Sequence, residues 1–165
     1  RQGFRWALRR GYELICQMDC DFSHRPQDLP KLIRTVESGE ADMAVGSRYV
    51  PGGRVENWPW KRVLLSKYAN IYARLLTRCG VKDLTGGFTC SRREVIEGID
   101  FESIKSEGYS FQIETKCRAA RRGFKIVEVP IVFVERERGA SKMSRKIIVE
   151  AFFTVLRLAF GRGLR

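Results

Sequence analysis

Two aspartates, Asp19 and Asp21, stand one residue apart directly after an apolar segment, residues 13–18. The segment is short and is followed by turn-forming residues, which predicts a buried strand of a parallel sheet. Open α/β sheets bind their ligands at the carboxyl ends of the strands, so the two carboxylates are expected at a binding site. Carboxylates are common ligands of hard divalent cations, which also contact substrate phosphates. The pair therefore predicts a site for a divalent metal ion, Mg²⁺ or Mn²⁺.

The charge of the chain points to anionic partners. Its 165 residues include 31 Lys and Arg against 19 Asp and Glu, a formal net charge of +12. Such a charge favours nucleic acid, an anionic membrane surface or phosphorylated small molecules. A metal ion that bridges a phosphorylated substrate to Asp19 and Asp21 would reconcile the acidic pair with the basic chain. The length fits one domain, and 44% apolar residues exclude a disordered chain.

The cysteines are odd in number and lack the C-x-x-C spacing of zinc and redox sites. They are Cys16, Cys20, Cys79, Cys90 and Cys117. We expect reduced thiols in a cytoplasmic protein, with neither a zinc site nor a disulfide framework.

Helical and strand patterns alternate along the chain. The expected helices are residues 3–10, Pro26 to Gly39, about 60–78, 92–98, 110–122 and about 144–160. The expected strands are residues 12–18, 42–46, a short one after 88, and 126–134. Pro130 cannot donate a main-chain hydrogen bond, so it predicts an edge or a bulge in the last of these strands. The alternation predicts a mostly parallel α/β layer fold.

The chain begins with Arg1, and residues 3–10 read as the later part of an α/β unit. We therefore expect that an amino-terminal part is missing. The sequence shows neither a signal-peptide pattern nor a run of 18 or more apolar residues.

Six short motifs follow one another in order over nearly the whole chain. They are Asp19-x-Asp21 with Ser23, His24 and Pro26; Gly46-Ser47-Arg48-Tyr49; Lys61-Arg62-x-x-x-Ser66; Asp83-x-Thr85-x-Gly87-Phe88; Gly108-Tyr109-x-Phe111-Gln112-x-Glu114; and Arg136-x-x-Gly139-x-Ser141-Lys142. This series resembles the dolichol-phosphate mannose synthases and related bacterial polyprenyl-phosphate sugar transferases, which are family-2 glycosyltransferases. A lone D-x-D is a weak signal, but six ordered motifs are a strong one.

The resemblance implies a partial GT-A fold, with a mostly parallel sheet and flanking helices. It implies that residues 1–165 form a single catalytic domain without its amino-terminal nucleotide-binding part. The implied reaction is an inverting, metal-dependent transfer of mannose from GDP-mannose to a polyprenyl (dolichyl) phosphate. A lipid acceptor also implies a membrane surface as partner and a peripheral location at its cytoplasmic face.

The resemblance assigns catalytic roles to four residues. Asp19 and Asp21 are expected to carry the metal ion, and Arg48 and Arg136 are expected to act on the anionic groups. Ser23 stands where several relatives carry a longer Gln ligand, so its part in metal binding stays open.

The expected substrate-binding residues come from four motifs. They are Arg62, Ser66, Asp83, Gln112, Glu114, Ser141 and Lys142. Arg62 and Ser66 lie one turn apart on a helix and can present one face to a phosphate. Ser141 and Lys142 lie with Arg136 on a loop that could close over a diphosphate. The acceptor phosphate is already anionic, so no general base is obligatory.

Two other functions stay open at this point. The same fold could take UDP-glucose or another sugar nucleotide. A non-catalytic basic module that binds nucleic acid or membrane is a further alternative, but no nucleic-acid motif is present and we expect no such partner. The final helix could lie at a membrane surface or in the core. Trp58 and Trp60 could likewise be core residues or lipid contacts.

Overall fold

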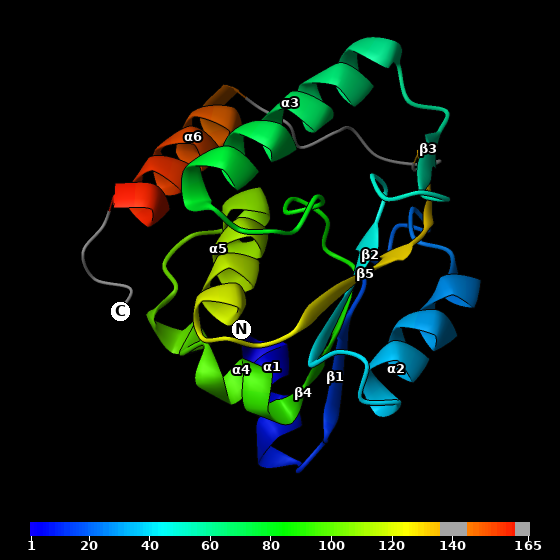
Figure 1. Cartoon of the computed structure of the whole chain (residues 1–165), viewed down its shortest axis with the longest axis vertical. Coiled ribbons are helices and arrows are strands. Elements are labelled where there is room, and N and C mark those ends of the chain that lie inside the picture. The colour runs from blue at the N-terminus through cyan, green and yellow to red at the C-terminus, as the bar shows by residue number, and fades with distance from the viewer. Residues whose placement is uncertain (136–144, 161–165) are drawn as a thin grey trace.

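A computed structural model describes residues 1–135 and 145–160 of the chain. Its centre is a four-stranded sheet with helices on both faces (Figure 1). The strands are β1 (Leu14–Gln17), β2 (Met43–Ser47), β4 (Thr89–Arg92) and β5 (Ile126–Pro130), in the spatial order β1-β4-β2-β5. Pairing is parallel between β2 and β5, whereas β4 runs antiparallel to both of its neighbours. Strands β1, β2 and β5 point the same way and β4 runs against them, so the sheet is mixed, with one parallel pairing. The expected α/β fold with a central sheet and flanking helices is confirmed.

The strand before Asp19 is less buried than the sequence predicts. Only Ile15 of β1 is buried, and Cys16 is exposed. The reason is its position, because β1 is the edge strand of the described sheet and pairs with β4 alone. The prediction of a fully buried strand is therefore wrong for this part of the chain, whereas β2 is buried at every position.

A second, two-stranded sheet lies where the sequence predicts only a loop and the end of a strand. β3 (Arg54–Glu56) pairs in parallel with β6 (Val132–Val134). The predicted strand 126–134 is therefore two strands in two sheets, divided at Ile131. Pro130 is the last residue of β5, the other edge of the main sheet, as the missing N–H of proline requires.

The helices follow the predicted order and differ at their ends by a few residues. They are α1 (Gln2–Arg9), α2 (Leu29–Glu37), α3 (Trp60–Thr77), α4 (Arg93–Gly98), α5 (Gly108–Arg121) and α6 (Arg145–Phe160), with 3₁₀ turns η1 (Pro26–Asp28) and η2 (Phe101–Ser103). In the described part of the chain, no helix is long and apolar enough to cross a bilayer.

Alternate residues of β2 supply the two hydrophobic cores. Met43 and Val45 face α1, α4, α5 and α6, whereas Ala44 faces α2. Figure 1 shows this division, with α2 alone on its side of the sheet. Gly46 continues the α2-side row, and a Cβ there would lie only 3.0 Å from a ring carbon of Phe88. Close packing at the end of β2 therefore requires glycine directly before Ser47 and Arg48.

Candidate active site

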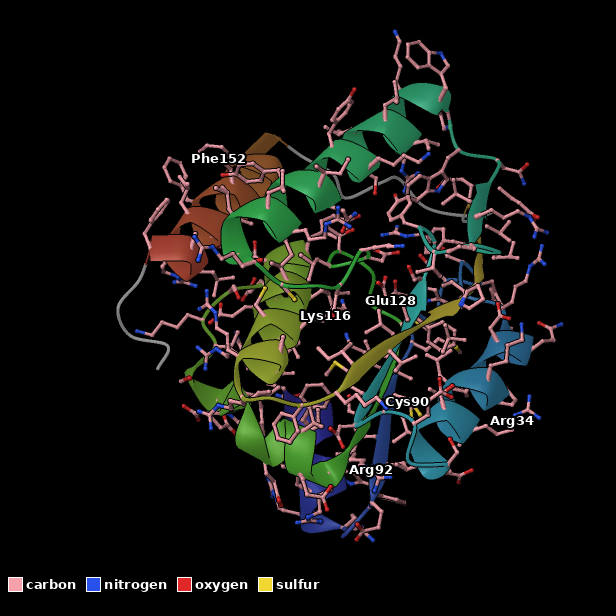
Figure 2. All side chains as sticks on the ribbon, in the orientation of Figure 1. Arg34, Cys90, Arg92, Lys116, Glu128 and Phe152 are labelled. Carbon is pink, nitrogen blue, oxygen red and sulfur yellow. The ribbon has the colours of Figure 1, made fainter. Side chains whose placement is uncertain are left out.

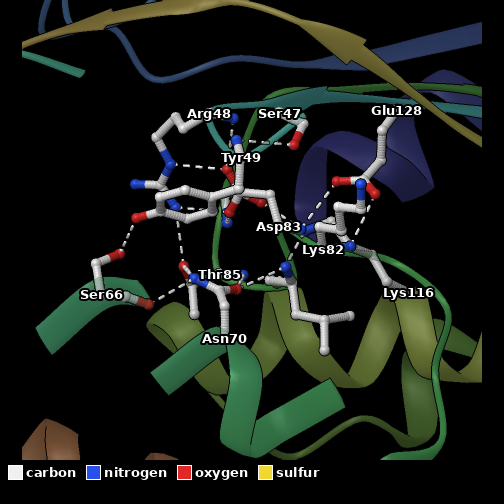
Figure 3. Close-up of polar contacts among 12 residues, drawn as sticks. Ser47, Arg48, Tyr49, Ser66, Asn70, Lys82, Asp83, Thr85, Lys116 and Glu128 are labelled. Carbon is white, nitrogen blue, oxygen red and sulfur yellow. Dashed lines mark hydrogen bonds and ion pairs between the residues drawn. The ribbon is translucent and has the colours of Figure 1, made fainter. Parts of the chain in front are cut away.

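The turn of residues 83–88 is anchored by a buried ion pair. Asp83 is fully buried, and both of its oxygens bind Arg48, which follows β2. Arg48 donates from Nε to Oδ2 at 2.7 Å, from Nη2 to Oδ1 at 2.6 Å and from its backbone N–H to Oδ2 at 3.0 Å (Figure 3). Burial raises the pKa of Asp83, but the Arg48 charge and these hydrogen bonds outweigh burial and hold the pKa below its usual value. The pair is therefore charged at neutral pH.

Aromatic rings enclose the Arg48 guanidinium. Its central carbon lies 5.2 Å from the ring centre of Tyr49, 5.5 Å from Trp58 and 5.4 Å from Phe133. Its Nη2 also donates to Thr85 Oγ1 at 2.9 Å. These contacts fix the guanidinium in one geometry. Because Nε and Nη2 are committed to protein partners, a substrate phosphate at Arg48 would have to use Nη1.

Asn70 of α3 holds the same turn from a second side. Its Oδ1 accepts from the backbone N–H of Leu84 at 2.8 Å and of Thr85 at 3.1 Å. Its Nδ2 donates to Thr85 Oγ1 at 3.1 Å. The buried Asn70 amide thus supplies the hydrogen-bond acceptor that these two backbone N–H groups would otherwise lack in the interior. Sequence reasoning missed Asn70, although a polar residue one turn after Ser66 was a signal.

Lys116 and Glu128 hold the turn from a third side. Lys116 of α5 is fully buried, and its Nζ donates to the carbonyl oxygens of Leu84 at 3.0 Å and Gly86 at 2.5 Å. Burial lowers the pKa of Lys116 to about 8. Glu128 of β5 accepts from the backbone N–H of Lys82 at 2.8 Å and of Asp83 at 2.9 Å. Figure 2 shows Lys116 in the interior, between α5 and the sheet. Neither residue belongs to a sequence motif, so both were missed.

The turn meets the acidic loop at Gly87. A Cβ on Gly87 would lie 3.4 Å from Asp19 Oδ1 and 3.6 Å from Gln112 Nε2. The structure therefore brings together residues from the first, fourth and fifth sequence motifs. A larger side chain at position 87 would fill the space beside the Asp19 carboxylate.

Arg62 and Ser66 lie one turn apart at the start of α3, as predicted. Arg62 forms an ion pair with Glu135, and its guanidinium carbon lies 4.0 Å from the ring centre of Trp58. Ser66 Oγ accepts from the Tyr49 hydroxyl at 2.6 Å. Both side chains thus have protein partners that the motif did not predict. Trp58 packs in this cluster, which favours the protein contact over a lipid contact for this residue.

An apolar cavity of about 300 Å³ lies beside this cluster, between α3, α5 and α6. Its walls include Tyr72 of α3, Ile113 of α5 and Phe152 of α6. Arg48 and Thr85 line it as well, so an apolar space ends at the polar turn. The arrangement suits a ligand that has a hydrocarbon part and an anionic head.

A comparison with known families identifies the family to which the chain belongs. Residues 1–100 match the family model for Glycosyl transferase family 2. This chain belongs to glycosyl transferase family 2. The match confirms the resemblance that the six motifs carried, and it agrees with the mixed α/β fold.

Three curated relatives of this family-2 chain are named as enzymes of mannosyl phospholipid synthesis. It is 54% identical over 153 residues to a polyprenol monophosphomannose synthase of Mycolicibacterium smegmatis, covering 93% of this chain and 57% of the relative. It is 46% identical to an undecaprenyl-phosphate mannosyltransferase of Micrococcus luteus, covering 94% and 63%. It is 38% identical to a dolichol-phosphate mannosyltransferase of Pyrococcus furiosus, covering 98% and 46%. The chain therefore spans about half to just under two thirds of the length of these relatives.

The residues around Asp19 fit the divalent cation expected in this glycosyltransferase. The Asp19 side chain is 54% exposed, and Asp21 Oδ1 accepts from the Ser23 backbone N–H at 3.1 Å. Ser23 is buried, yet its Oγ has no hydrogen-bond partner among the described residues. Hard oxygen donors are the right set for Mg²⁺ or Mn²⁺. Residues 1–135 and 145–160 hold no cluster of three or more His, Cys, Asp or Glu side chains for a metal. The described acidic, His and Cys side chains are therefore too few to surround a cation by themselves, and oxygens of substrate or water can complete its coordination.

His24 holds the loop of Asp19 and Asp21 through a hydrogen bond. Its Nδ1 accepts from the Asp19 backbone N–H at 3.2 Å, and its ring packs against Phe88 and Phe133. Burial lowers the pKa of His24, so the neutral ring that can accept this hydrogen bond is favoured. The histidine thus positions the loop.

Glu114 is not brought to the site. It is buried, and it accepts from Ser106 Oγ at 2.7 Å, Arg118 Nη2 at 2.6 Å and Arg157 Nη2 at 3.0 Å. Two residues along a helix turn the side chain by about 200°, so Glu114 and Gln112 face opposite sides of α5. In this structure Glu114 joins α5 to α6, and its role in substrate binding stays a prediction.

Three predicted residues, Arg136, Ser141 and Lys142, lie outside the described residues, so their roles stay predictions. Glu135, directly before them, pairs with Arg62, and its backbone N–H donates to the Glu56 carbonyl at 3.0 Å.

Proposed function

We propose that this chain carries the catalytic site of a polyprenyl-phosphate mannosyltransferase. The donor is GDP-mannose, the acceptor is a polyprenyl (dolichyl) phosphate, and the anomeric centre is inverted. One observation carries the proposal, namely that the apolar cavity ends at the polar side chains of Arg48 and Thr85. Thr85 lies on the 83–88 turn, and Gly87 of the same turn borders Asp19. A lipid tail and a charged reaction centre thus find adjacent places. The names of the three relatives support mannose as the transferred sugar and a polyprenyl phosphate as the acceptor.

The reaction requires one displacement. An oxygen of the acceptor phosphate forms a bond to C1 of mannose while the bond from C1 to the diphosphate oxygen breaks, and GDP leaves with the electron pair. The nucleophile is already anionic, so no side chain has to remove a proton. The chain supplies position and charge stabilisation, which are large terms in enzymatic rates.

Asp19 and Asp21 are the residues that would hold a divalent metal, with Ser23 beside them. The metal would offset the charge that develops on the departing diphosphate. Arg136, Ser141 and Lys142 are proposed to contact the same diphosphate. Their cationic and hydroxyl groups match its oxygens.

The acceptor phosphate is proposed to bind near Arg62 and Ser66. Glu135 pairs with Arg62, so an incoming phosphate would compete with this carboxylate. Asp83 acts through Arg48, which it holds in place beside the cavity. Gln112 lies beside Gly87, where a polar side chain can meet the sugar or the diphosphate.

Exposed apolar side chains on two helices support a peripheral place at the cytoplasmic face of a membrane. They include Trp60, Leu64, Tyr68, Ile71 and Leu75 of α3 and Phe152, Phe153 and Phe160 of α6. Exposed apolar patches of this kind mark interaction surfaces, and the basic chain suits anionic lipid.

The test is a transfer assay on the full-length protein with GDP-mannose and a polyprenyl phosphate. We expect mannosyl lipid from the native protein, loss of product on chelation of divalent metal, and recovery on adding Mg²⁺ or Mn²⁺. Asp21→Asn should abolish transfer, whereas the control Glu40→Gln, at an exposed acid three residues after the end of α2, should not.

Two results would overturn parts of the proposal. Transfer from UDP-glucose but not from GDP-mannose would replace the donor. Failure to bind any nucleotide sugar, together with salt-sensitive binding to duplex DNA, would replace the enzyme with a basic binding module.

A further inference from the structure

A second cavity, of about 590 Å³, lies against the opposite face of α3. The apolar cavity contacts this helix through residues such as Leu65 and Tyr72, whereas the second contacts it through Lys67 and Arg74. At about 100° per residue these two sets point to opposite sides of the helix. The second cavity is therefore separate from the one assigned to the acceptor lipid.

Positive charge gathers in this second cavity. Lys67 and Arg74 lie two turns apart on one face of α3, and Lys82 lines the cavity from the segment that leads into the 83–88 turn. None of the described residues that line it is acidic. Arg48 also lines it, but Asp83 neutralises that charge.

The three outer cations form no ion pair among the described residues. Glu128 lies beside Lys82, but its oxygens accept from the backbone N–H groups of Lys82 and Asp83 and not from the Lys82 ammonium group. Within the described ranges, neither Lys67, Arg74 nor Lys82 has a carboxylate oxygen within 4.0 Å of its charged nitrogens. Like charges that share a concave surface repel one another, and a bound anion would relieve that repulsion.

An exposed apolar stripe runs between the two cavities. Leu64, Tyr68, Ile71 and Leu75 recur at helical spacing, with Ile71 46% and Leu75 67% exposed. Tyr68 lines the apolar cavity and Ile71 lines the basic one. A lipid layer that meets this stripe would place its phosphates at the height of Lys67 and Arg74.

We propose that the cavity of Lys67, Arg74 and Lys82 is a binding site for a phosphate group that takes no part in the transfer reaction. The group is borne by an anionic lipid headgroup or by free phosphate or diphosphate. Guanidinium and ammonium groups are the donors that proteins use for phosphate, and the cavity volume admits a headgroup. The site goes beyond the proposed transferase function and does not depend on it.

Methyl NMR of the full-length protein can test the site, because the two cavities carry different isoleucines. Ile71 lines the basic cavity and Ile113 lines the apolar one. The probes are inorganic diphosphate and monomeric dihexanoyl phosphatidic acid, with dihexanoyl phosphatidylcholine as the zwitterionic control. We expect a saturable shift of the Ile71 methyl resonance with at least one anionic probe, little shift of Ile113, and weaker binding in more salt.

Variants assign the shift to charge. Lys67→Gln combined with Arg74→Gln should weaken binding by roughly tenfold or more, because the variant loses two of the positive charges that attract the phosphate group. Lys67→Arg should retain it. The control Arg34→Gln, on the outside of α2 (Figure 2), should leave it within about twofold, as expected for a distant charge.

The outcomes separate the phosphate sources. Equal shifts with diphosphate and phosphatidic acid identify a general phosphate site, and a shift with phosphatidic acid alone identifies a headgroup site. A shift of Ile113 only, no shift with either probe, an undiminished shift in the double variant, or equal losses in Lys67→Arg and Lys67→Gln would each overturn the proposal.

Discussion

The two carboxylate centres of the site lie in opposite environments. Asp83 is fully buried and both of its oxygens bind Arg48, whereas the Asp19 side chain is 54% exposed. The backbone around Asp83 is bound by buried side chains of α3 and α5 and by the half-buried Glu128 of β5. Near Asp19, by contrast, the buried Ser23 hydroxyl lacks a partner in the part of the chain that the structure describes.

This difference separates framework from ligand site. The 83–88 turn has its polar groups satisfied by protein, so it is formed before any substrate binds. In this loop the half-exposed Asp19 carboxylate, and the Ser23 hydroxyl that has no partner among the described residues, offer oxygen atoms to a ligand. Substitutions in the turn should therefore lower folding stability together with activity, whereas substitutions in the loop should lower activity alone.

The largest effect is expected from Asp19→Asn. We expect transfer to fall by more than about 1,000-fold, about 4 kcal/mol in the activation barrier, because the amide cannot offset the metal charge. The free energy of unfolding should stay nearly unchanged, since the carboxylate is half exposed. Initial rates and urea denaturation measure the two quantities. A variant that retains a tenth of the activity would contradict the role of Asp19.

Asp83→Asn should lower stability and activity together. It leaves the buried Arg48 guanidinium without a counter-charge, and breaking a buried pair in this way costs about 4 kcal/mol of unfolding free energy. Transfer should fall as well, because the turn beside Asp19 loses its anchor.

Chemical denaturation of Asp83→Asn, of Arg48→Met and of the double variant measures the coupling. The double variant should recover part of the loss, since neither buried charge remains. Glu102→Gln, which breaks the exposed pair with Arg5, is the control and should hardly change stability. Additive losses at Asp83 and Arg48 would show that the pair does not couple.

The sequence predicted the parts of the fold that local chemistry decides. Pro26 opens the 3₁₀ turn η1 that leads into α2 at Leu29, and α5 ends before Gly123. Both features follow from backbone restrictions that proline and glycine carry by themselves. β3 was missed because three residues in a loop rich in Gly and Pro show no alternating pattern. The split after Pro130 was only half predicted, since the proline marks an edge but not a change of sheet.

The site was predictable where a motif placed ligand-binding groups and unpredictable where side chains bind main chain. The motifs indicated Asp19, Gly87 and Gln112, and the structure brings these three together. Asn70 and Lys116 bind backbone groups of a turn that is distant in sequence, so only the folded chain shows their partners. Side chains that bind distant backbone groups show no regular spacing in the sequence by which they could be recognised.

Lys116 sharpens the comparison through pH. Burial lowers its pKa to about 8, against roughly 10.4 in an unfolded chain. Between these values the unfolded state binds more protons, so the stability of the native protein should rise with pH, by about 3 kcal/mol in all. Below pH 8 both states are protonated and this contribution is constant. Lys116→Met should lose the rise.

Urea denaturation across pH 8 to 10.5 measures the difference between the two proteins. Arg48, Asp83, Cys79 and Cys117 are the charged and titratable neighbours of Lys116, and they are the same in both. Lys105→Met, at an exposed lysine, is the control and should keep the native slope. Identical slopes in native protein and Lys116→Met would mean that Lys116 does not titrate in this range.

Asn70→Ala should have a smaller effect on the same turn. The backbone N–H groups of Leu84 and Thr85 lose their acceptor, which costs about 2 kcal/mol of unfolding free energy. Hydrogen exchange of these two amides should accelerate in the variant. If their exchange and the stability both stay native, Asn70 is dispensable, and Arg48, Lys116 and Glu128 hold the turn without it.

Ser23→Ala should have the smallest effect on the fold, and it probes the open side of the comparison. The buried Ser23 Oγ has no protein partner in the described ranges, so removing it should leave stability unchanged or raise it by up to about 1 kcal/mol. If the hydroxyl contacts the metal, the Mg²⁺ concentration for half-maximal transfer should rise several-fold while the maximal rate stays nearly native. Ser103→Ala, at an exposed serine that belongs to none of the motifs, is the control for metal dependence and should leave the Mg²⁺ concentration for half-maximal transfer unchanged. A loss of stability in Ser23→Ala would show that the hydroxyl has a structural partner, and the acidic loop would then resemble the buried turn more than its exposed carboxylate suggests.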